Sequence, residues 1–181
     1  MRVIAGSARG VPLGAPRDRG TRPITDRVKE TLFAILGDRV PDARVLDLYA
    51  GSGAIGIEAL SRGAASADFV ERARPALMAL RENLERTRLG GHARVHATDV
   101  ERFADAAEGT WDLVVADPPY DDARAIVAPL RDVASWLAPG GTLVLKHFWR
   151  DPPPEIERMR VSRQRRFGET MLTFMEAADE S

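Results

Sequence analysis

A glycine-rich segment at residues 47–56 constrains the fold of this chain more than any other feature. It reads Asp47-Leu-Tyr-Ala-Gly-Ser-Gly-Ala-Ile-Gly56 and follows an apolar run. Its three glycines allow a tight turn from a strand into a helix and a close approach of the backbone to a ligand. The segment therefore predicts a ligand-binding loop between a strand and a helix of an α/β sheet.

Apolar runs alternate with helical patterns between residues 44 and 146, as is typical of a parallel sheet built from βαβ units. The predicted strands are Arg44–Tyr49, Ala67–Glu71, Ala93–Ala97, Trp111–Ala116 and Thr142–Lys146. Predicted helices cover residues 54–62, a stretch that begins at Pro75, and a stretch from Asp121 or Asp122 toward Trp136. Pro139-Gly140-Gly141 is then expected to turn the chain into the fifth strand.

Both ends of the chain lie outside this pattern. Residues 1–24 contain four Gly and three Pro, which predicts extended or hairpin structure before a helix that Thr25 caps. Near the other end, residues 158–167 and 170–175 flank Gly168 and predict a terminal antiparallel hairpin. We expect a basic N-terminal extension of residues 1–24 and a main body of residues 25–181, together forming one compact domain.

The chain has no cysteine, and its three histidines show no spacing that suits a metal. A disulfide framework and a thiolate metal site are therefore excluded, and no metal cofactor is expected. No run approaches the roughly eighteen apolar residues of a membrane span, and the N-terminus lacks the apolar stretch of a signal peptide. These features predict a cytoplasmic protein without a membrane partner.

The formal net charge of -1 hides an uneven distribution of charge. Residues 1–30 hold seven Arg or Lys against three acids, and residues 150–166 hold six Arg against three acids. Basic ends around an acidic middle fit a nucleic-acid partner and a cationic cofactor. They fit a mixed solvated surface equally well, so charge alone leaves both interpretations open.

Asp47 favours one class of nucleotide cofactor. The glycine pattern also fits the dinucleotide fingerprint, but a carboxylate in the first loop would repel a pyrophosphate and attract sulfonium and ammonium groups. Asp47 therefore indicates S-adenosylmethionine. Glu71, at the end of the second strand, is expected to accept from ribose hydroxyls, unless it pairs with Arg72 or Arg74. Asp99 could accept from an adenine amino group, cap a helix, or do both.

Asp117-Pro118-Pro119-Tyr120 is the most specific motif in the chain. The two prolines remove two N–H donors and fix φ twice, which leaves carbonyl groups and a carboxylate as a rigid set of acceptors. Two acceptors that hold the hydrogens of an exocyclic amine can aim its lone pair at a methyl carbon in line with sulfur. We expect Asp117 and the Pro118 carbonyl to do this, while Tyr120 stacks on the base. A proline-rich turn after a buried strand is the structural alternative.

Other singled-out residues have two possible roles. His147 follows the predicted fifth strand, where it could touch substrate or be structural. Trp111 and Trp136 are expected to pack in the core, and Trp149 either packs or forms an RNA-facing surface pair with Arg150.

The sequence resembles the RsmD-type family of bacterial methyltransferases, which modify N2 of a guanine in small-subunit ribosomal RNA. Five ordered segments carry the resemblance across nearly the whole chain: Arg2–Gly10, Thr21–Glu30, Asp47–Gly63, Asp117–Tyr120 and Arg166–Thr170. The resemblance implies a Rossmann-like class I methyltransferase fold, with a mostly parallel seven-stranded sheet, a C-terminal antiparallel hairpin and helices on both faces. Lys146 departs from the family pattern, because relatives often place an acid at residues 145–147.

The resemblance also implies partners. S-adenosylmethionine would be converted to S-adenosylhomocysteine without a metal, and the substrate would be 16S rRNA in a 30S subunit or an assembly intermediate, bound by a monomer. The residues expected to bind the cofactor are Asp47, Tyr49, Gly51, Ser52, Gly53, Glu71, Arg72, Asp99 and Val100. The expected catalytic residues are Asp117, Pro118, Pro119 and Tyr120. The residues expected to contact RNA are Arg9, Arg22, Thr25, Arg27 and Arg166.

Other functions stay open at this point. A methyltransferase acting on an adenine or on a protein glutamine would keep the cofactor loop and a related motif, although Asp117 and the lack of an extra recognition domain argue against it. A nicotinamide-dependent oxidoreductase is disfavoured because the chain has no room for a second substrate domain. The protein could also be a catalytically silent RNA-binding or assembly factor, and only an activity assay would exclude this interpretation.

Overall fold

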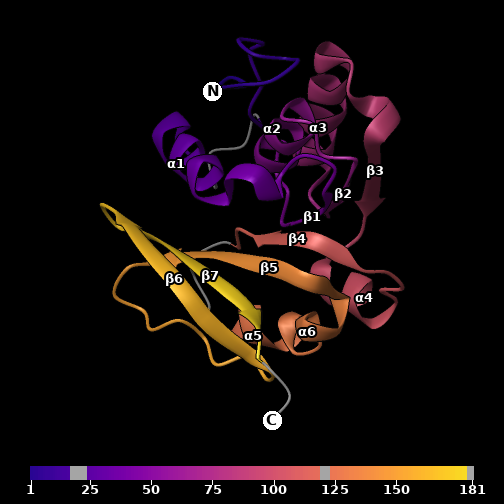
Figure 1. Ribbon diagram of the computed structural model, residues 1–181. Helices are drawn as coiled ribbons and strands as arrows, with labels where there is room; N and C mark the ends of the chain where they lie inside the picture. The colour runs from indigo at the N-terminus through magenta and orange to yellow at the C-terminus, as the bar shows by residue number, and fades with distance from the viewer. Residues whose placement is uncertain (17–23, 119–122, 179–181) are drawn as a thin grey trace.

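The computed structural model describes residues 1–16, 24–118 and 123–178, and it is built around one seven-stranded sheet (Figure 1). The strands are Arg44–Leu48 (β1), Ser66–Glu71 (β2), Ala93–Ala97 (β3), Trp111–Ala116 (β4), Leu137–Phe148 (β5), Met159–Phe167 (β6) and Thr170–Ala177 (β7). The α-helices are Asp26–Leu36 (α1), Ala54–Ser61 (α2), Arg74–Thr87 (α3), Val100–Asp105 (α4), Ala123–Leu130 (α5) and Val133–Trp136 (α6). Short 3-10 turns cover Gly37–Arg39 (η1) and Gly90–His92 (η2).

The strand order is β3-β2-β1-β4-β5-β7-β6. The first five strands pair in parallel, and β7 pairs antiparallel with both β5 and β6. The predicted seven-stranded sheet with a terminal antiparallel hairpin is therefore confirmed. Its order reverses direction between β1 and β4, and in open α/β sheets ligands bind outside the carboxyl ends of the strands at such a point.

Two apolar layers cover the two faces of the sheet. Alternate strand residues point to opposite faces, so Val45 lies in one layer and Leu46 in the other. The first layer contains apolar side chains of α1, α2 and α3, and the second contains those of α4, α5 and α6 (Figure 1). Val115 and Val144 share the face of Val45. This alternation fixes the face on which the polar residues at the strand ends lie.

The segment before β5 differs from the sequence prediction. Pro139-Gly140-Gly141 was expected to form a turn, but β5 already begins at Leu137, which pairs with Trp111 of β4. An irregularity in the β4–β5 register follows, and Gly140 adopts a φ of 77°. The strand thus passes through the glycines as a bulge, and the predicted turn into a strand that begins at Thr142 is wrong.

The expected single helix toward Trp136 is two helices. Pro129 lies in the last turn of α5, where it removes a backbone donor, and α5 ends at Leu130. The chain turns and re-enters a short helix in which Ser135 N–H donates to the carbonyl of Asp132. The predicted caps Asp121 and Asp122 lie outside the described residues.

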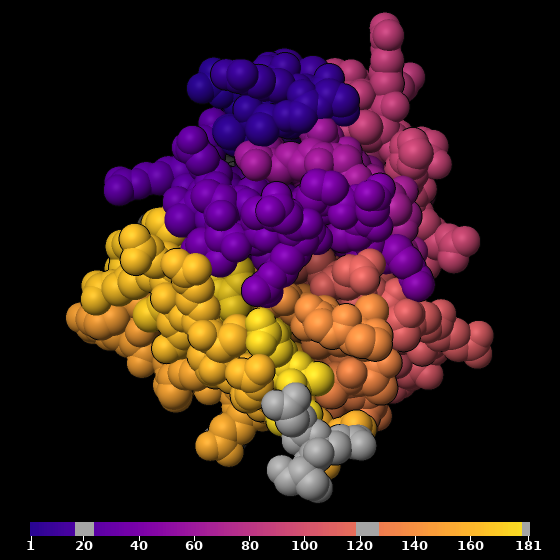
Figure 2. All heavy atoms as spheres, in the orientation of Figure 1, coloured from indigo at the N-terminus to yellow at the C-terminus, as the bar shows by residue number. Residues whose placement is uncertain are grey.

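The N-terminal residues form a hairpin that is attached to α2 and α3. Backbone hydrogen bonds cross it at Val3, whose N–H donates to the Val11 carbonyl and whose carbonyl accepts from the Gly10 N–H. Ser61 of α2 accepts from the Ala8 N–H at 2.9 Å. In Figure 2 this hairpin lies at the top of the molecule, while the β6–β7 hairpin lies at the lower left.

A buried charge cluster holds the same hairpin. Glu58 of α2 is fully buried, and its carboxylate accepts from the backbone N–H groups of Ile4 and Ala5 at 2.8 and 3.0 Å. It also pairs with Arg62 at 2.8 Å and with the fully buried Lys29 of α1 at 3.2 Å. The Lys29 ammonium donates in turn to the carbonyl of Arg2. Sequence reasoning did not find this cluster, because its members come from three separate segments.

No helix within the described ranges is long and apolar enough to span a bilayer.

Candidate active site

The loop after β1 carries a strained residue. Tyr49 has a φ of 59°, a left-handed conformation that is unusual for an aromatic residue and that concentrates at functional sites. Burial raises the pKa of its half-buried phenol; Glu101 adds to this increase and Arg72 opposes it. The four residues that follow turn the chain into α2, and Asn83 of α3 fixes this turn by donating to the carbonyl of the buried Ser52 at 2.9 Å.

The three glycines of the loop differ in the space around them. A Cβ on Gly53 would lie 2.2 Å from Leu80, and one on Gly56 would lie 2.3 Å from the Phe69 ring. These two glycines therefore allow α2 to pack on its neighbours. Gly51 has a φ of 56°, and the nearest atom to its Cβ would be the Tyr49 carbonyl oxygen at 4.0 Å. Of the three, only Gly51 leaves open space beside the loop.

Glu71 binds the loop from the end of β2. Its carboxylate accepts from the Gly51 N–H at 2.9 Å and from the N–H groups of Arg72 and Ala73 at 2.8 and 2.6 Å. The alternative ion pair with Arg72 or Arg74 does not form among the described residues. Glu71 therefore stands beside the open side of Gly51 with its carboxylate oriented by backbone donors.

Asp47 lies beneath the loop. Its side chain is buried and accepts from the Gly56 N–H at 2.9 Å. Burial raises its pKa from the ordinary value of 3.8 to about 8; the Gly56 hydrogen bond opposes this increase, while the nearby carboxylates of Asp117 and Glu71 add to it. Three acids thus gather at the carboxyl ends of β1, β2 and β4.

Asp99 takes the helix-capping role that the sequence allowed. Its carboxylate accepts from the Arg102 N–H at 2.8 Å at the start of α4. Val100 behind it is buried at 4% exposure. The cap lies at the end of β3, so it is compatible with a second role at the edge of a cofactor pocket.

Asp117 directly follows β4 and pairs with a buried lysine. The Lys146 ammonium of β5 lies 2.5 Å from Oδ1 of Asp117. The Asp117 side chain is 19% exposed, and that of Lys146 is 8% exposed. Burial raises the pKa of Asp117, and the charge and hydrogen bond of Lys146 oppose this increase. Sequence reasoning noted Lys146 only as a departure from the family pattern.

Several predicted residues lie apart from this cluster or outside the described residues. Pro118 is buried next to Asp117, whereas Pro119, Tyr120 and Arg22 belong to ranges that are not described. Arg9 and Arg27 are exposed, on the N-terminal hairpin and on α1.

Two of the residues expected to contact RNA have contacts within the protein. The Thr25 hydroxyl accepts from the Val28 N–H as the cap of α1. The Arg166 guanidinium lies over the Trp149 ring, 3.4 Å from its centroid, while that of Arg150 lies at 5.1 Å.

His147 is held by the protein rather than directed to a ligand. It is buried, and its Nδ1 and Nε2 lie 3.0 Å from the Phe148 carbonyl and 2.8 Å from the Thr173 hydroxyl. Burial lowers its pKa, so the neutral ring fits this position. These contacts within the protein fit the structural role of His147 and not a contact with substrate.

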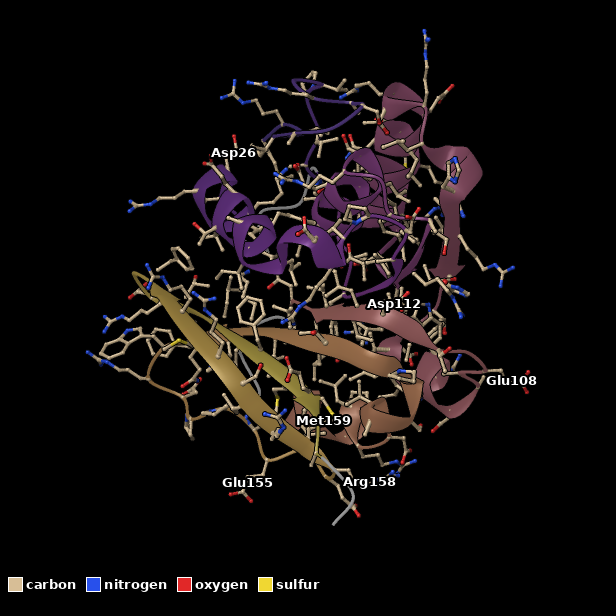
Figure 3. The ribbon with its side chains drawn as sticks, in the orientation of Figure 1. Asp26, Glu108, Asp112, Glu155, Arg158 and Met159 are labelled. Carbon is tan, nitrogen blue, oxygen red and sulfur yellow. The ribbon has the colours of Figure 1, made fainter. Side chains whose placement is uncertain are left out.

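A hollow on the surface lies elsewhere. It is lined by residues of and beside α6, together with Glu157 and Arg158 near the start of β6. Figure 3 labels Arg158. The helix α6 leads into the amino end of β5, the edge opposite to the acidic cluster. None of the predicted site residues lines this hollow.

The strand order, the loop after β1 and the acceptors at the carboxyl ends define a class I methyltransferase. Known proteins agree with this class. The chain is 38% identical to "Putative rRNA methyltransferase YlbH" of Bacillus subtilis over 94% of its own length and 95% of that protein. It is 46% identical to "Ribosomal RNA small subunit methyltransferase D" of Escherichia coli over 66% of its length and 60% of that protein.

A solved structure shows the same fold over the whole chain. "Putative methyltransferase yhhF from Escherichia coli" superposes with a TM-score of 0.86, at 33% identity, over 99% of both chains. The family model described as "Conserved hypothetical protein 95" matches residues 1–176. The chain belongs to this family, and it is a methyltransferase.

Proposed function

We propose that this protein transfers a methyl group from S-adenosylmethionine to N2 of a guanine in 16S rRNA, within a 30S subunit or an assembly intermediate. The names of the two relatives support rRNA as the substrate class. The observation that carries the proposal is the position of Asp117, a partly exposed carboxylate at the switch point of the sheet beside the glycine loop.

The residues around the loop fit a cationic cofactor. S-adenosylmethionine, when bound, supplies a methyl group on a positively charged sulfur. Asp47 is a buried carboxylate that burial disfavours in its charged form, so a nearby cation would compensate its charge. Glu71 would accept from the ribose hydroxyls, and Gly51 would let the cofactor approach the backbone. Asp99 and Val100 would border the adenine.

Asp117 and the Pro118 carbonyl would orient the acceptor amine. The amine of guanine is a poor nucleophile because its lone pair is delocalised into the ring. A carboxylate oxygen and a carbonyl oxygen that accept its two hydrogens direct the lone pair at the methyl carbon. The C–S bond would break as the N–C bond forms, and the nitrogen would then release one proton to solvent. Tyr120 would stack on the base after the base leaves its helix.

The exposed arginines would bind the RNA backbone. Arg9 and Arg27, together with Arg22 and Arg166, would contact phosphates on RNA that ribosomal proteins have already shaped. The protein would act as a monomer, and free guanosine would not be a substrate.

Mass mapping of nucleosides tests this function. Unmethylated 30S subunits are incubated with the protein and labelled S-adenosylmethionine, and the rRNA is digested. The expected product is N2-methylguanine, and Asp117→Ala should lower the rate by at least about 100-fold with cofactor affinity within a few-fold. A product of N6-methyladenine, or label on a protein glutamine, would contradict the guanine assignment. Binding without any product would favour a silent assembly factor.

A further inference from the structure

The chain contains two lysines among its 26 basic residues, and both are buried in ion pairs. Lys29 pairs with Glu58 between α1 and α2, and neither residue belongs to the strand ends that carry the predicted catalytic residues. Lys146 pairs with Asp117. The other 24 basic residues are arginines. The two lysines, whose side chains end in a compact ammonium group, therefore both lie next to a carboxylate that is largely buried.

The sheet places Lys146 and Asp117 on one face at one edge. Ala116 pairs with Leu145 in the parallel β4–β5 register, so the next residues, Asp117 and Lys146, are neighbours. Val115 and Val144 lie in the layer that contains α1 and α2, and residues two further along point to the same face. By the same alternation Asp47 shares that face, two residues after Val45. Lys146 therefore lies beside Asp117 on the adjacent strand β4, and it shares a face with Asp47 on β1, one strand further along.

Burial would oppose the ionisation of Asp117 without this lysine. Of the other acids at this edge, Asp47 lies on β1 and Glu71 ends β2, and burial also disfavours the charged form of Asp47. Lys146 from β5 supplies the positive charge. Opposite Lys146 on β7 stands the apolar Leu172.

The protonation state of Asp117 decides whether it can orient an amine. An ionised carboxylate only accepts hydrogen bonds, whereas a protonated one also presents an O–H donor. An amine whose hydrogens must be held by acceptors fits the ionised form. The Lys146 ammonium occupies one acceptor position on Oδ1, and an ionised carboxylate has further lone pairs that can receive an amine hydrogen.

We propose that Lys146 is a positioning residue for methyl transfer, which holds Asp117 as an ionised, acceptor-only carboxylate in its buried position. This inference rests on the proposed role of Asp117. Lys146 itself touches neither methyl donor nor acceptor in this scheme and acts through Asp117.

The test is the pH profile of single-turnover methyl transfer with unmethylated 30S subunits and saturating labelled S-adenosylmethionine. In Lys146→Met the acidic limb should move upward by about one pH unit or more, because the loss of the ammonium raises the pKa of Asp117 further. At a fixed pH on the acidic limb the rate should fall about tenfold, and it should recover as the pH rises. Cofactor affinity should stay within a few-fold. Lys146→Arg should keep the parental midpoint even if its maximal rate is lower.

The matched control is Lys29→Met, which removes the other buried lysine. It should lower the melting temperature yet leave the midpoint of the pH profile unchanged below that temperature. If Lys146→Met does not fold, Lys146→Gln replaces it with a neutral side chain that can still donate to Asp117. A parental midpoint in both neutral variants, with Asp117→Ala inactive, would overturn this inference and leave the proposed function standing. Full activity of Asp117→Ala would instead overturn the role of Asp117 itself.

Discussion

At the scale of single residues, the buried carboxyl group of Asp47 makes the stability of the fold depend on pH. The folded-state pKa is about 8 against an ordinary value of 3.8. Between these two values the unfolded chain has lost a proton that the folded chain keeps, so the unfolding free energy falls as the pH rises. The stabilising contribution of the protonated group is complete below the lower pKa and is lost as the pH rises through about 8.

Asp47→Asn should therefore flatten the pH dependence of stability in the ligand-free protein. Urea unfolding at about pH 5 and about pH 8 measures the slope, which should be smaller in the variant because one group with a raised pKa has gone. Glu108→Gln, in the exposed loop before β4 (Figure 3), is the control and should keep the parental slope. An equal slope in Asp47→Asn would show that Asp47 ionises normally in the folded state.

At the scale of elements, the loop between β1 and α2 should bind the cofactor at Gly51, the glycine of the loop with free space beside it. Gly51→Arg would place a side chain in that space and should weaken S-adenosylmethionine binding at least about tenfold in calorimetry. Gly140→Arg is the control: Gly140 also has a positive φ, 77°, with nothing near its Cβ, but it lies at the amino end of β5. Equal affinities in the two variants would exclude Gly51 from the cofactor site.

The buried cluster around Glu58 makes a second prediction at this scale. Glu58→Gln leaves the ammonium of Lys29 buried without its carboxylate, which should cost about 3–5 kcal/mol of unfolding free energy. Glu176→Gln, which loses surface pairs with Arg39 and Arg160, should cost less than about 1 kcal/mol. Urea unfolding compares the two. Similar losses would mean that the cluster is not what attaches the N-terminal hairpin to α1 and α2.

Sequence patterns predicted the elements but not the contacts between them. β3 and β4 have the predicted bounds because apolar runs and polar ends mark buried strands locally. Gly53 was expected to face a ligand, yet its open side is filled by Leu80, which is 27 positions away. The Lys146–Asp117 pair could not be predicted either, because it depends on which strands are neighbours and on the register in which they pair. Pair formation across a sheet is a property of topology, which no local pattern contains.

At the scale of the whole molecule, the N-terminal hairpin lies at the top and the β6–β7 hairpin at the lower left of Figure 2, and α1 lies between them in Figure 1. Arginines on a protein surface bind phosphates through charge, and each phosphate contact contributes about 0.9 to the slope of log affinity against log salt for duplexes and about 0.7 for single strands.

Arg27→Ala should therefore lower this slope by roughly one unit and weaken binding to 30S subunits without changing the methylated atom. Arg39→Ala removes the same charge, but the Arg39 guanidinium lies within 3.0 Å of the Thr142 hydroxyl and 3.4 Å of Glu176, so its slope should remain parental. Methyl transfer is measured over a range of salt concentrations at fixed substrate. Equal slopes in the two variants would show that α1 does not face the RNA, and the contacts would then have to be sought on β6.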